Sequence, residues 1–290
     1  MNNVNNAIEV KNLTKNYKTF SLDGISFNVP HGYVCGFIGE NGAGKTTTLK
    51  LVTGMVLRDS GEINILGKSA DEPSAKKDLG ILFEQSHLYE NWTAINIEKA
   101  LRPFYENWDS TAYHGYLEKF SLLQRQKVKK MSRGMKIKLA MAVTLSHDAK
   151  LLLLDEPTAG LDPAARDEML DIMRGYIADG DRSVFFSTHI TSDLEKIADY
   201  IVYISGGKIL FSGLKDELIE KYCLVKGGVK ELNELPESKR KNIIGLRDSG
   251  TAGGFEGMME VMNTGGLPPG IITETVSLED VMIHSERSRK

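Results

Sequence analysis

The sequence contains little cysteine, no excess of basic charge and no long hydrophobic run. Its two cysteines, Cys35 and Cys223, are too few for a disulfide framework, so we expect a reducing compartment such as the cytosol. The formal net charge of −3 provides no general basic field, and no nucleic-acid partner is expected. No apolar run approaches the roughly 18–20 residues that cross a bilayer. The polar start from Met1 to Asn6 lacks the layout of a signal peptide, so a role at a membrane would depend on other chains.

The most informative stretch runs from Gly39 to Thr47 and matches the pattern G-x-x-x-x-G-K-[ST]. The apolar run Tyr33–Ile38 predicts a buried strand before it, and a helical pattern ending near Gly54 follows it. Glycines let successive backbone N–H groups point into one concavity, and the helix N-terminus adds a positive end that suits a di- or triphosphate. A chance glycine-rich turn is the alternative, but the strand and the helix supply the context that the motif requires. The residues expected to bind the nucleoside triphosphate are Gly39, Glu40, Asn41, Gly42, Ala43, Gly44, Lys45, Thr46 and Thr47.

Two acids are expected beside this loop. Asp155 and Glu156 follow the apolar run Leu151–Leu154, which predicts a buried strand of a parallel sheet. Lys45 would reach the β- and γ-phosphates, while the Thr46 hydroxyl and the Asp155 carboxylate would hold Mg²⁺. Glu156 can activate the attacking water as a general base. A pair of solvated charges is the alternative, and the buried approach to these two acids weighs against it.

A histidine ends another predicted strand. His189 follows the apolar run Val184–Ser187, which would bring it to the same sheet edge. A lone histidine is usually structural, but the carboxyl ends of strands are where ligands bind in an open α/β sheet. We therefore favour a functional role for His189 over a structural one.

The rest of the first half predicts short strands and then a helical insert at about residues 86–147. The end of this insert is strongly basic, with no acid from Phe120 to Ser146. A solvated face and an anion-facing surface both remain open for it. The strands expected around the phosphate-binding loop are Ala7–Val10, Ser26–Val29, Glu62–Leu66 and Gly80–Phe83, with a turn at Asp23-Gly24.

The second half predicts further strands and helices, and its pattern weakens after Gly213. Asp162 and Pro163 are typical of a helix start, as N-cap and first-turn residue. The stretch Gly245–Gly270 holds eight glycines and two prolines, which indicates loops, a small irregular domain or mobility. The other expected features are a capping box of Ser192 with Glu195, a hairpin of Tyr200–Ile204 with Ile209–Ser212, a helix over Leu214–Tyr222 and a final helix starting within Ser277–Met282.

Taken in order, these features resemble an ATP-binding cassette (ABC) ATPase, the nucleotide-binding subunit of a transporter, over roughly residues 7–215. The resemblance implies an α/β fold over residues 1–215, namely a P-loop NTPase core with an antiparallel β subdomain and a helical insert. Residues 216–290 would form a small C-terminal accessory segment. The matching positions are Tyr17, which would stack on adenine, Gly39–Thr47 (Walker A), Met131–Met135 (signature loop), Leu151–Glu156 (Walker B with the catalytic glutamate), Ala159–Asp162 (D-loop) and His189 (switch histidine).

The family resemblance also implies ligands and partners. ATP and Mg²⁺ would be bound between two subunits arranged head to tail, in a homodimer or a heterodimer. Ser132 would present its hydroxyl, and Gly134 an N–H at a helix N-terminus, to the γ-phosphate on the other subunit. ATP would then bring the subunits together and hydrolysis would release them. In the D-loop, the resemblance singles out Asp162 as a site residue.

Two positions depart from the family pattern. In the signature loop the pattern is Leu-Ser-Gly-Gly-Gln, whereas Arg133 and Met135 occupy its third and fifth positions here. Arg133 either raises affinity for phosphate or is a tolerated replacement. The second departure is the usual metal-contacting glutamine, which aligns with Glu84, with Gln85 beside it as the alternative. A carboxylate is a better ligand for a hard cation than an amide, which favours Glu84.

Together, the acid at Glu84, the signature loop and an extension ending in Ser277–Asp280 resemble one bacterial subgroup. It comprises the ATP-binding subunits of bacitracin-resistance and lantibiotic-export transporters. This implies separate transmembrane permease subunits, an exporting direction and a peripheral location on the inner face of the cell membrane. The permease's coupling helices would dock near Glu84–Trp92, between core and insert. Nothing in the sequence identifies the cargo.

Two other functions remain as alternatives. A soluble ABC ATPase acting on the ribosome or DNA is disfavoured, because the chain has a single Walker A loop and too short an insert for a long coiled coil. A regulatory subunit that binds ATP without turnover is disfavoured because Glu156 and His189 are both present.

Overall fold

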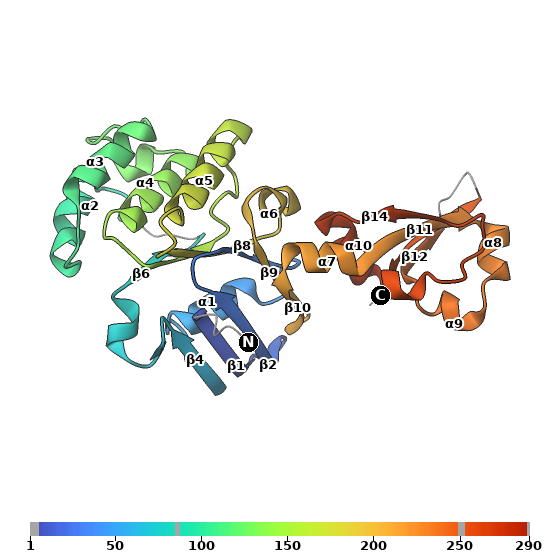
Figure 1. The fold of residues 1–290 in the computed structure, drawn as a ribbon. Helices are drawn as coiled ribbons and strands as arrows, with labels where there is room; N and C mark the ends of the chain where they lie inside the picture. The colour runs from blue at the N-terminus through green and yellow to red at the C-terminus, as the bar shows by residue number, and fades with distance from the viewer. Residues whose placement is uncertain (1–5, 85–87, 249–252, 289–290) are drawn as a thin grey trace. The chain divides into compact units, whose positions relative to one another are not determined.

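The computed structural model describes residues 6–84, 88–248 and 253–288. The chain forms two compact units, Met1–Ser212 and Gly213–Lys290. Figure 1 traces the chain from blue at the N-terminus to red at the C-terminus. Each unit contains its own sheets and helices.

A six-stranded sheet forms the centre of the larger unit, in the order β10-β9-β3-β8-β7-β6. The four pairings from β9 to β6 are parallel, and β3, β7 and β8 are buried throughout, as expected for a sheet covered on both faces. In register, Ile38 pairs with Thr188 and Asp155 with Ser187, so the carboxyl ends of these three strands share one edge. The adjacent β9 and β10 form the predicted hairpin. The strands are β3 (Val34–Ile38), β6 (Leu79–Leu82), β7 (Leu151–Asp155), β8 (Ser183–Thr188), β9 (Tyr200–Ser205) and β10 (Lys208–Leu214).

An antiparallel sheet in the order β2-β1-β4-β5 forms the second layer of this unit. The predicted turn at Asp23-Gly24 is wrong, because both residues lie inside β2. The register shifts there, from Leu13 opposite Ile25 to Lys15 opposite Leu22, so a bulge in β2 takes up the extra residue and the positive φ of Gly24. The turn instead lies between β1 and β2. The strands are β1 (Asn6–Asn16), β2 (Ser21–Pro30), β4 (Ser60–Ile65) and β5 (Lys68–Ser69).

Helices surround the six-stranded sheet, and Figure 1 shows α2, α3 and α4 gathered at one end of this unit. The Asp162 carboxylate caps α5 by accepting from the N–H groups of Ala164 and Ala165, as predicted. The predicted Ser192 capping box is wrong: the N-cap of α6 is Ile190, two residues before Ser192, and Ser192 lies within the first turn. The α-helices are α1 (Lys45–Val52), α2 (Ala94–Leu101), α3 (Ser110–Lys119), α4 (Arg133–Leu145), α5 (Pro163–Tyr176) and α6 (Thr191–Ile197). The 3-10 helices are η1 (Pro73–Lys76), η2 (Arg102–Phe104) and η3 (Val128–Lys130).

The smaller unit has an antiparallel sheet of its own, in the order β12-β13-β11-β14. Two of these strands occupy the glycine-rich stretch, for which the sequence left loops, a small irregular domain or mobility open. The stretch belongs to a regular sheet within a small compact unit. Gly257 sits where a Cβ would lie 2.2 Å from a methyl group of Ile243, which makes a glycine necessary inside the packed sheet. The strands are β11 (Tyr222–Gly228), β12 (Ile244–Asp248), β13 (Gly254–Glu260) and β14 (Ile272–Thr275).

The helices of the smaller unit pack against this sheet. The predicted final helix is present, and Ser277 and Asp280 form a capping box at its start. The predicted helix over Leu214–Tyr222 is present as α7. One core of this unit includes Val225, Phe255 and Met259. The helices are α7 (Lys215–Lys221), α8 (Val229–Glu234), α9 (Glu237–Arg240), η5 (Val261–Asn263) and α10 (Leu278–Arg287).

Candidate functional site

The phosphate-binding loop joins β3 to α1, and glycine is required at its tightest points. A Cβ on Gly39 would lie 2.3 Å from the carbonyl oxygen of Ile204. Gly44 has a φ of 115°, a left-handed conformation that a side chain would strain. Gly44 is also the N-cap of α1, and the N–H groups of the first turn of α1 have no partner within the helix. This end of α1 is therefore suited to an anion.

Lys45 lies inside the loop and is buried. Its Nζ donates to the carbonyl oxygen of Gly39 at 2.7 Å and to that of Glu40 at 3.3 Å, and lies 3.6 Å from a carboxylate oxygen of Glu156. The ammonium group is thus held in the concavity by carbonyl oxygens and one carboxylate. It is placed to meet a phosphate that enters the loop.

Asp155 ends β7 and is 1% exposed. Its carboxylate accepts from the Thr46 hydroxyl at 2.9 Å and from the Ser187 hydroxyl at 2.6 Å. Ser187 is not among the residues predicted from the sequence. Its signal there is a polar residue at the end of a predicted apolar strand, and its contact with Asp155 depends on the pairing of β7 with β8. The three oxygen-bearing side chains form a compact polar group at the floor of the site.

Glu156 follows directly and contacts the predicted histidine. His189 Nδ1 lies 2.8 Å from the Glu156 carboxylate, and the Glu156 backbone N–H donates to the Ser187 hydroxyl at 3.1 Å. Glu156 has a φ of 52°, an uncommon conformation for a residue with a side chain, which turns the chain sharply after β7. Burial raises the pKa of Glu156, while the Lys45 and His189 charges act in the opposite direction.

A second buried contact supports this edge of the sheet. The Thr158 hydroxyl donates to the Asp193 carboxylate at 2.6 Å, which joins the turn after Glu156 to α6. Since α6 begins two residues after His189, this bond helps to fix the histidine relative to Glu156. The sequence reasoning did not select either partner.

Lys45, Thr46 and Glu156 line one cleft of about 370 Å³. Asp155 and His189 are not among its described lining residues, and they adjoin it through their contacts with Thr46 and Glu156. Phe20 lines it, whereas Tyr17, the residue expected to stack on adenine, is not among the described residues at its wall. Tyr17 is exposed in the turn between β1 and β2, with Lys15 Nζ 5.7 Å from its ring centroid. The cleft is lined by Phe20, Glu40, Asn41, Gly42, Gly44, Lys45, Thr46, Thr47, Glu84 and Glu156.

The signature loop lies elsewhere, since none of its four candidate residues is among the described residues lining the cleft. Ser132 caps α4, with its hydroxyl oxygen accepting from the Met135 N–H at 3.2 Å. Arg133 forms an ion pair with Glu84 at 2.6 Å. Gly134 lies beside Leu161 of the D-loop, since a Cβ on Gly134 would stand 3.3 Å from a methyl carbon of Leu161. Ser132 and Gly134 are thus at a helix N-terminus that this chain's own cleft does not use.

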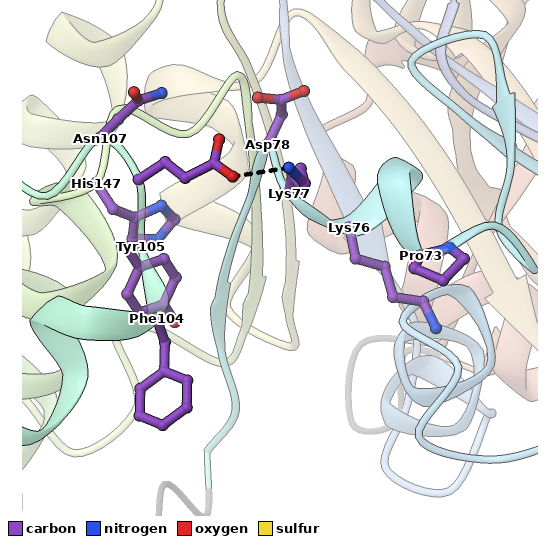
Figure 2. A pocket seen from close by; sticks show the side chains of 9 residues that line it. Pro73, Lys76, Lys77, Asp78, Phe104, Tyr105, Asn107 and His147 are labelled. Carbon is purple, nitrogen blue, oxygen red and sulfur yellow. Dashed lines mark hydrogen bonds and ion pairs between the residues drawn. The ribbon is translucent and has the colours of Figure 1, made fainter.

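A second cavity, of about 330 Å³, lies between the core and the insert (Figure 2). Figure 2 shows the Tyr105 ring beside His147 and the ion pair between Lys77 and Glu106 that bridges the two sides. Phe104 is 82% exposed. The cavity is lined by Pro73, Lys76, Lys77, Asp78, Phe104, Tyr105, Glu106, Asn107 and His147.

Comparison with known proteins identifies the family. Residues 22–159 match the family model described as ABC transporter. The lantibiotic transport ATP-binding protein SrtF of Streptococcus pyogenes is 36% identical over 206 residues, covering 70% of this chain and 89% of that protein. The chain belongs to the ABC transporter family. It is an ATP-binding subunit of this family and an ATPase, as predicted.

Two further matches agree with this assignment. The bacitracin transport ATP-binding protein BcrA of Bacillus licheniformis is 35% identical over 208 residues, covering 70% of this chain and 68% of that protein. The solved structure of an ATP-binding subunit of an ABC transporter is 28% identical, with a TM-score of 0.65 over 73% of this chain and 91% of that one. The predicted fold class and the resemblance to the bacitracin and lantibiotic subgroup are therefore confirmed. Among the described residues of this ABC ATPase, no helix is both long enough and apolar enough to cross a membrane.

The raised pKa of Glu156 predicts how turnover responds to acid if Glu156 is the general base, the role proposed below. A general base must be deprotonated and kcat/KM reports the free enzyme, so kcat/KM should fall as the pH drops through a pKa above the ordinary carboxyl value of 4.5. Below that pKa, kcat/KM should fall by about tenfold per pH unit. Phosphate release at low ATP concentration, measured between neutral and mildly acidic pH, checks this, with ATP affinity followed in parallel as the control. A kcat/KM that stays flat down to the ordinary carboxyl range would contradict that role.

Proposed function

We propose that this ABC ATPase cleaves ATP in the cleft of the larger unit to energise an exporter whose membrane-spanning subunits are separate polypeptides. The observation that carries the proposal is the convergence of Lys45, Asp155, Glu156 and His189 at one sheet edge. The chain would lie on the inner face of the cell membrane, held there by the membrane subunits. The two relatives named for lantibiotic and bacitracin transport support a role in the same class of system.

In this mechanism each residue has a distinct task. Lys45 exchanges its contact with Glu156 for the β- and γ-phosphates, which leaves the Glu156 carboxylate free to accept a proton from water. His189 holds the Glu156 carboxylate through the contact at 2.8 Å and orients it toward the terminal phosphate. The first-turn N–H groups of α1 bind phosphate oxygens. Phe20 or Tyr17, at the two ends of one short turn, would contact the base.

The donor set fits Mg²⁺. Thr46, Asp155 and Glu84 offer hydroxyl and carboxylate oxygens, the ligands that a hard cation prefers, and Thr46 already contacts Asp155. When bound, the metal would neutralise the charge that develops on the phosphates. We assign Glu84 to this site because it lines the cleft and offers a carboxylate. The alternative, Gln85, lies outside the described residues.

The signature loop would complete the site of a second copy. Ser132 and Gly134 stand at the start of α4, yet they do not line this chain's own cleft. Ser132 caps the Met135 N–H, so the N–H groups of Arg133 and Gly134 are the ones left to bind an anion. A head-to-tail pair of chains would place this loop on the partner's nucleotide, with Arg133, Met135 and Asp162 at the same contact. A pair of identical chains would supply both the loop that holds the nucleotide and the signature loop that covers it, so no different ATPase subunit is needed.

The membrane subunit would dock where the core meets the insert. Phe104 stands exposed at the cavity in Figure 2, and Tyr89 and Trp92 add exposed rings at the expected docking segment. Exposed aromatic side chains suit the apolar face of a short helix, and Phe104 also lines the cavity. The occupant we propose is therefore a cytosolic helix of the membrane subunit.

Replacing Phe104 with Asp tests the docking surface. The variant should lose most co-purification with the proposed membrane subunit, because a charge replaces the apolar anchor. Leu210→Asp is the matched control: Leu210 is 43% exposed but lies on β10, at the sheet edge opposite β6. It should retain co-purification. Equal losses for the two variants, or none for Phe104→Asp, would contradict this docking site.

A further inference from the structure

Two residues that depart from the family pattern are joined to each other. Arg133 Nη2 lies 2.6 Å from Glu84 Oε1, although 49 residues separate them in the chain. The family pattern has glutamine and glycine at these two positions, and neither residue carries a charge. The ion pair therefore exists only because both departures occur together in this chain.

Arg133 is constrained from two sides. It is the first residue of α4, and its side chain lies against Gly160 of the D-loop. A Cβ on Gly160 would stand 3.3 Å from both Cδ and Nε of Arg133, and Gly160 has a φ of 77°. The guanidinium group is thus set between the D-loop and Glu84, so it links the signature loop to the wall of the nucleotide cleft.

Glu84 is the shared element. Its carboxylate lines the cleft together with Thr46 and Glu156, while it also binds Arg133. A carboxylate that neutralises a guanidinium group attracts a second cation less strongly, because the two positive charges repel each other. The pair is partly exposed, at 59% for Arg133 and 43% for Glu84, so the competition is modest and reversible.

We propose that Arg133 is a positioning residue that competes with the metal for Glu84. In the nucleotide-free chain the ion pair holds Glu84 on the signature loop, and arrival of the metal with ATP releases Arg133. Metal binding in one chain thereby changes the contacts of the signature loop of that same chain. This inference rests on the proposed function, since it takes Glu84 as a metal ligand.

Metal binding without turnover tests the competition. Mn²⁺ is titrated, with its free paramagnetic resonance signal as the readout, into ATP-loaded Glu156→Gln chains that carry Arg133→Gln, Glu84→Gln, both or neither. Arg133→Gln should tighten Mn²⁺ binding about two- to fivefold, the range of an exposed ion pair. Glu84→Gln should weaken it, and adding Arg133→Gln to Glu84→Gln should change nothing further.

Two controls make the result specific. Lys138→Gln removes the same charge from α4 by breaking the pair with Glu168 and should leave Mn²⁺ affinity unchanged. Arg133→Lys keeps the charge, and its Mn²⁺ affinity should stay close to that of the chain with Arg133. Weaker Mn²⁺ binding in Arg133→Gln, or the same change with and without Glu84, would overturn the inference. Calorimetry with ATP separates the two proposals: failure to bind ATP would overturn both, whereas normal ATP binding without the coupling would overturn only this one.

Discussion

Glu156→Gln is expected to lower kcat by roughly 10²–10⁴-fold while ATP still binds. The amide keeps the size of the side chain but cannot accept a proton from water at neutral pH. Because the buried carboxylate also pairs with Lys45 at 3.6 Å, its removal leaves the ammonium free for phosphate, so ATP affinity should not fall. Phosphate release measures the rate of hydrolysis, and calorimetry measures the affinity for ATP on the same preparation.

The control for this variant is Glu168→Gln. It removes a carboxylate from the same unit, but one that pairs with Lys138 away from the cleft, and it should hydrolyse ATP normally. Turnover by Glu156→Gln at the unsubstituted rate would show that another group activates the water. Loss of ATP binding together with turnover would point instead to damage of the loop.

Lys45→Ala should weaken ATP binding on the order of 30-fold or more, the effect of removing one partner from a buried charge contact. The phosphates lose the ammonium group that the loop holds in its concavity. Calorimetry in the Glu156→Gln background measures the affinity without hydrolysis.

Lys50→Ala is the matched control, because Lys50 lies in the last turn of the same helix, α1. It should bind ATP as the unsubstituted chain does. An undiminished affinity in Lys45→Ala, with the fold intact by circular dichroism, would contradict the assignment of the loop.

The sequence was sufficient where local pattern decides the structure. The loop from Gly39 to Thr47 needs glycines at fixed places, and Asp155 with Glu156 follows an apolar strand, so both were predictable without tertiary information. The edge that brings His189 to Glu156 followed from strand ends in a parallel sheet. The contact at 2.8 Å between them agrees with that reasoning.

The sequence was insufficient where packing between distant segments decides. Ser187 contacts Asp155 only because β7 and β8 pair in one register, and the Arg133 contact with Glu84 spans 49 residues. In the smaller unit, the glycines left loops, a small irregular domain or mobility open, whereas Gly257 is required by close packing against Ile243 within the sheet. The turn predicted at Asp23-Gly24 is wrong because these two residues form a bulge inside β2.

The central claim is that each nucleotide is closed between two copies, one supplying Lys45 and the other Ser132. The complete transporter assembled from equal amounts of Lys45→Ala and Ser132→Asp chains tests it most directly. Each variant alone should be nearly inactive, but mixed pairs contain one site with both residues intact. The account predicts recovery of about a quarter of the unsubstituted ATPase rate, since half of the pairs are mixed and half of their sites are whole. A mixture no more active than the average of the two separate variants would contradict it.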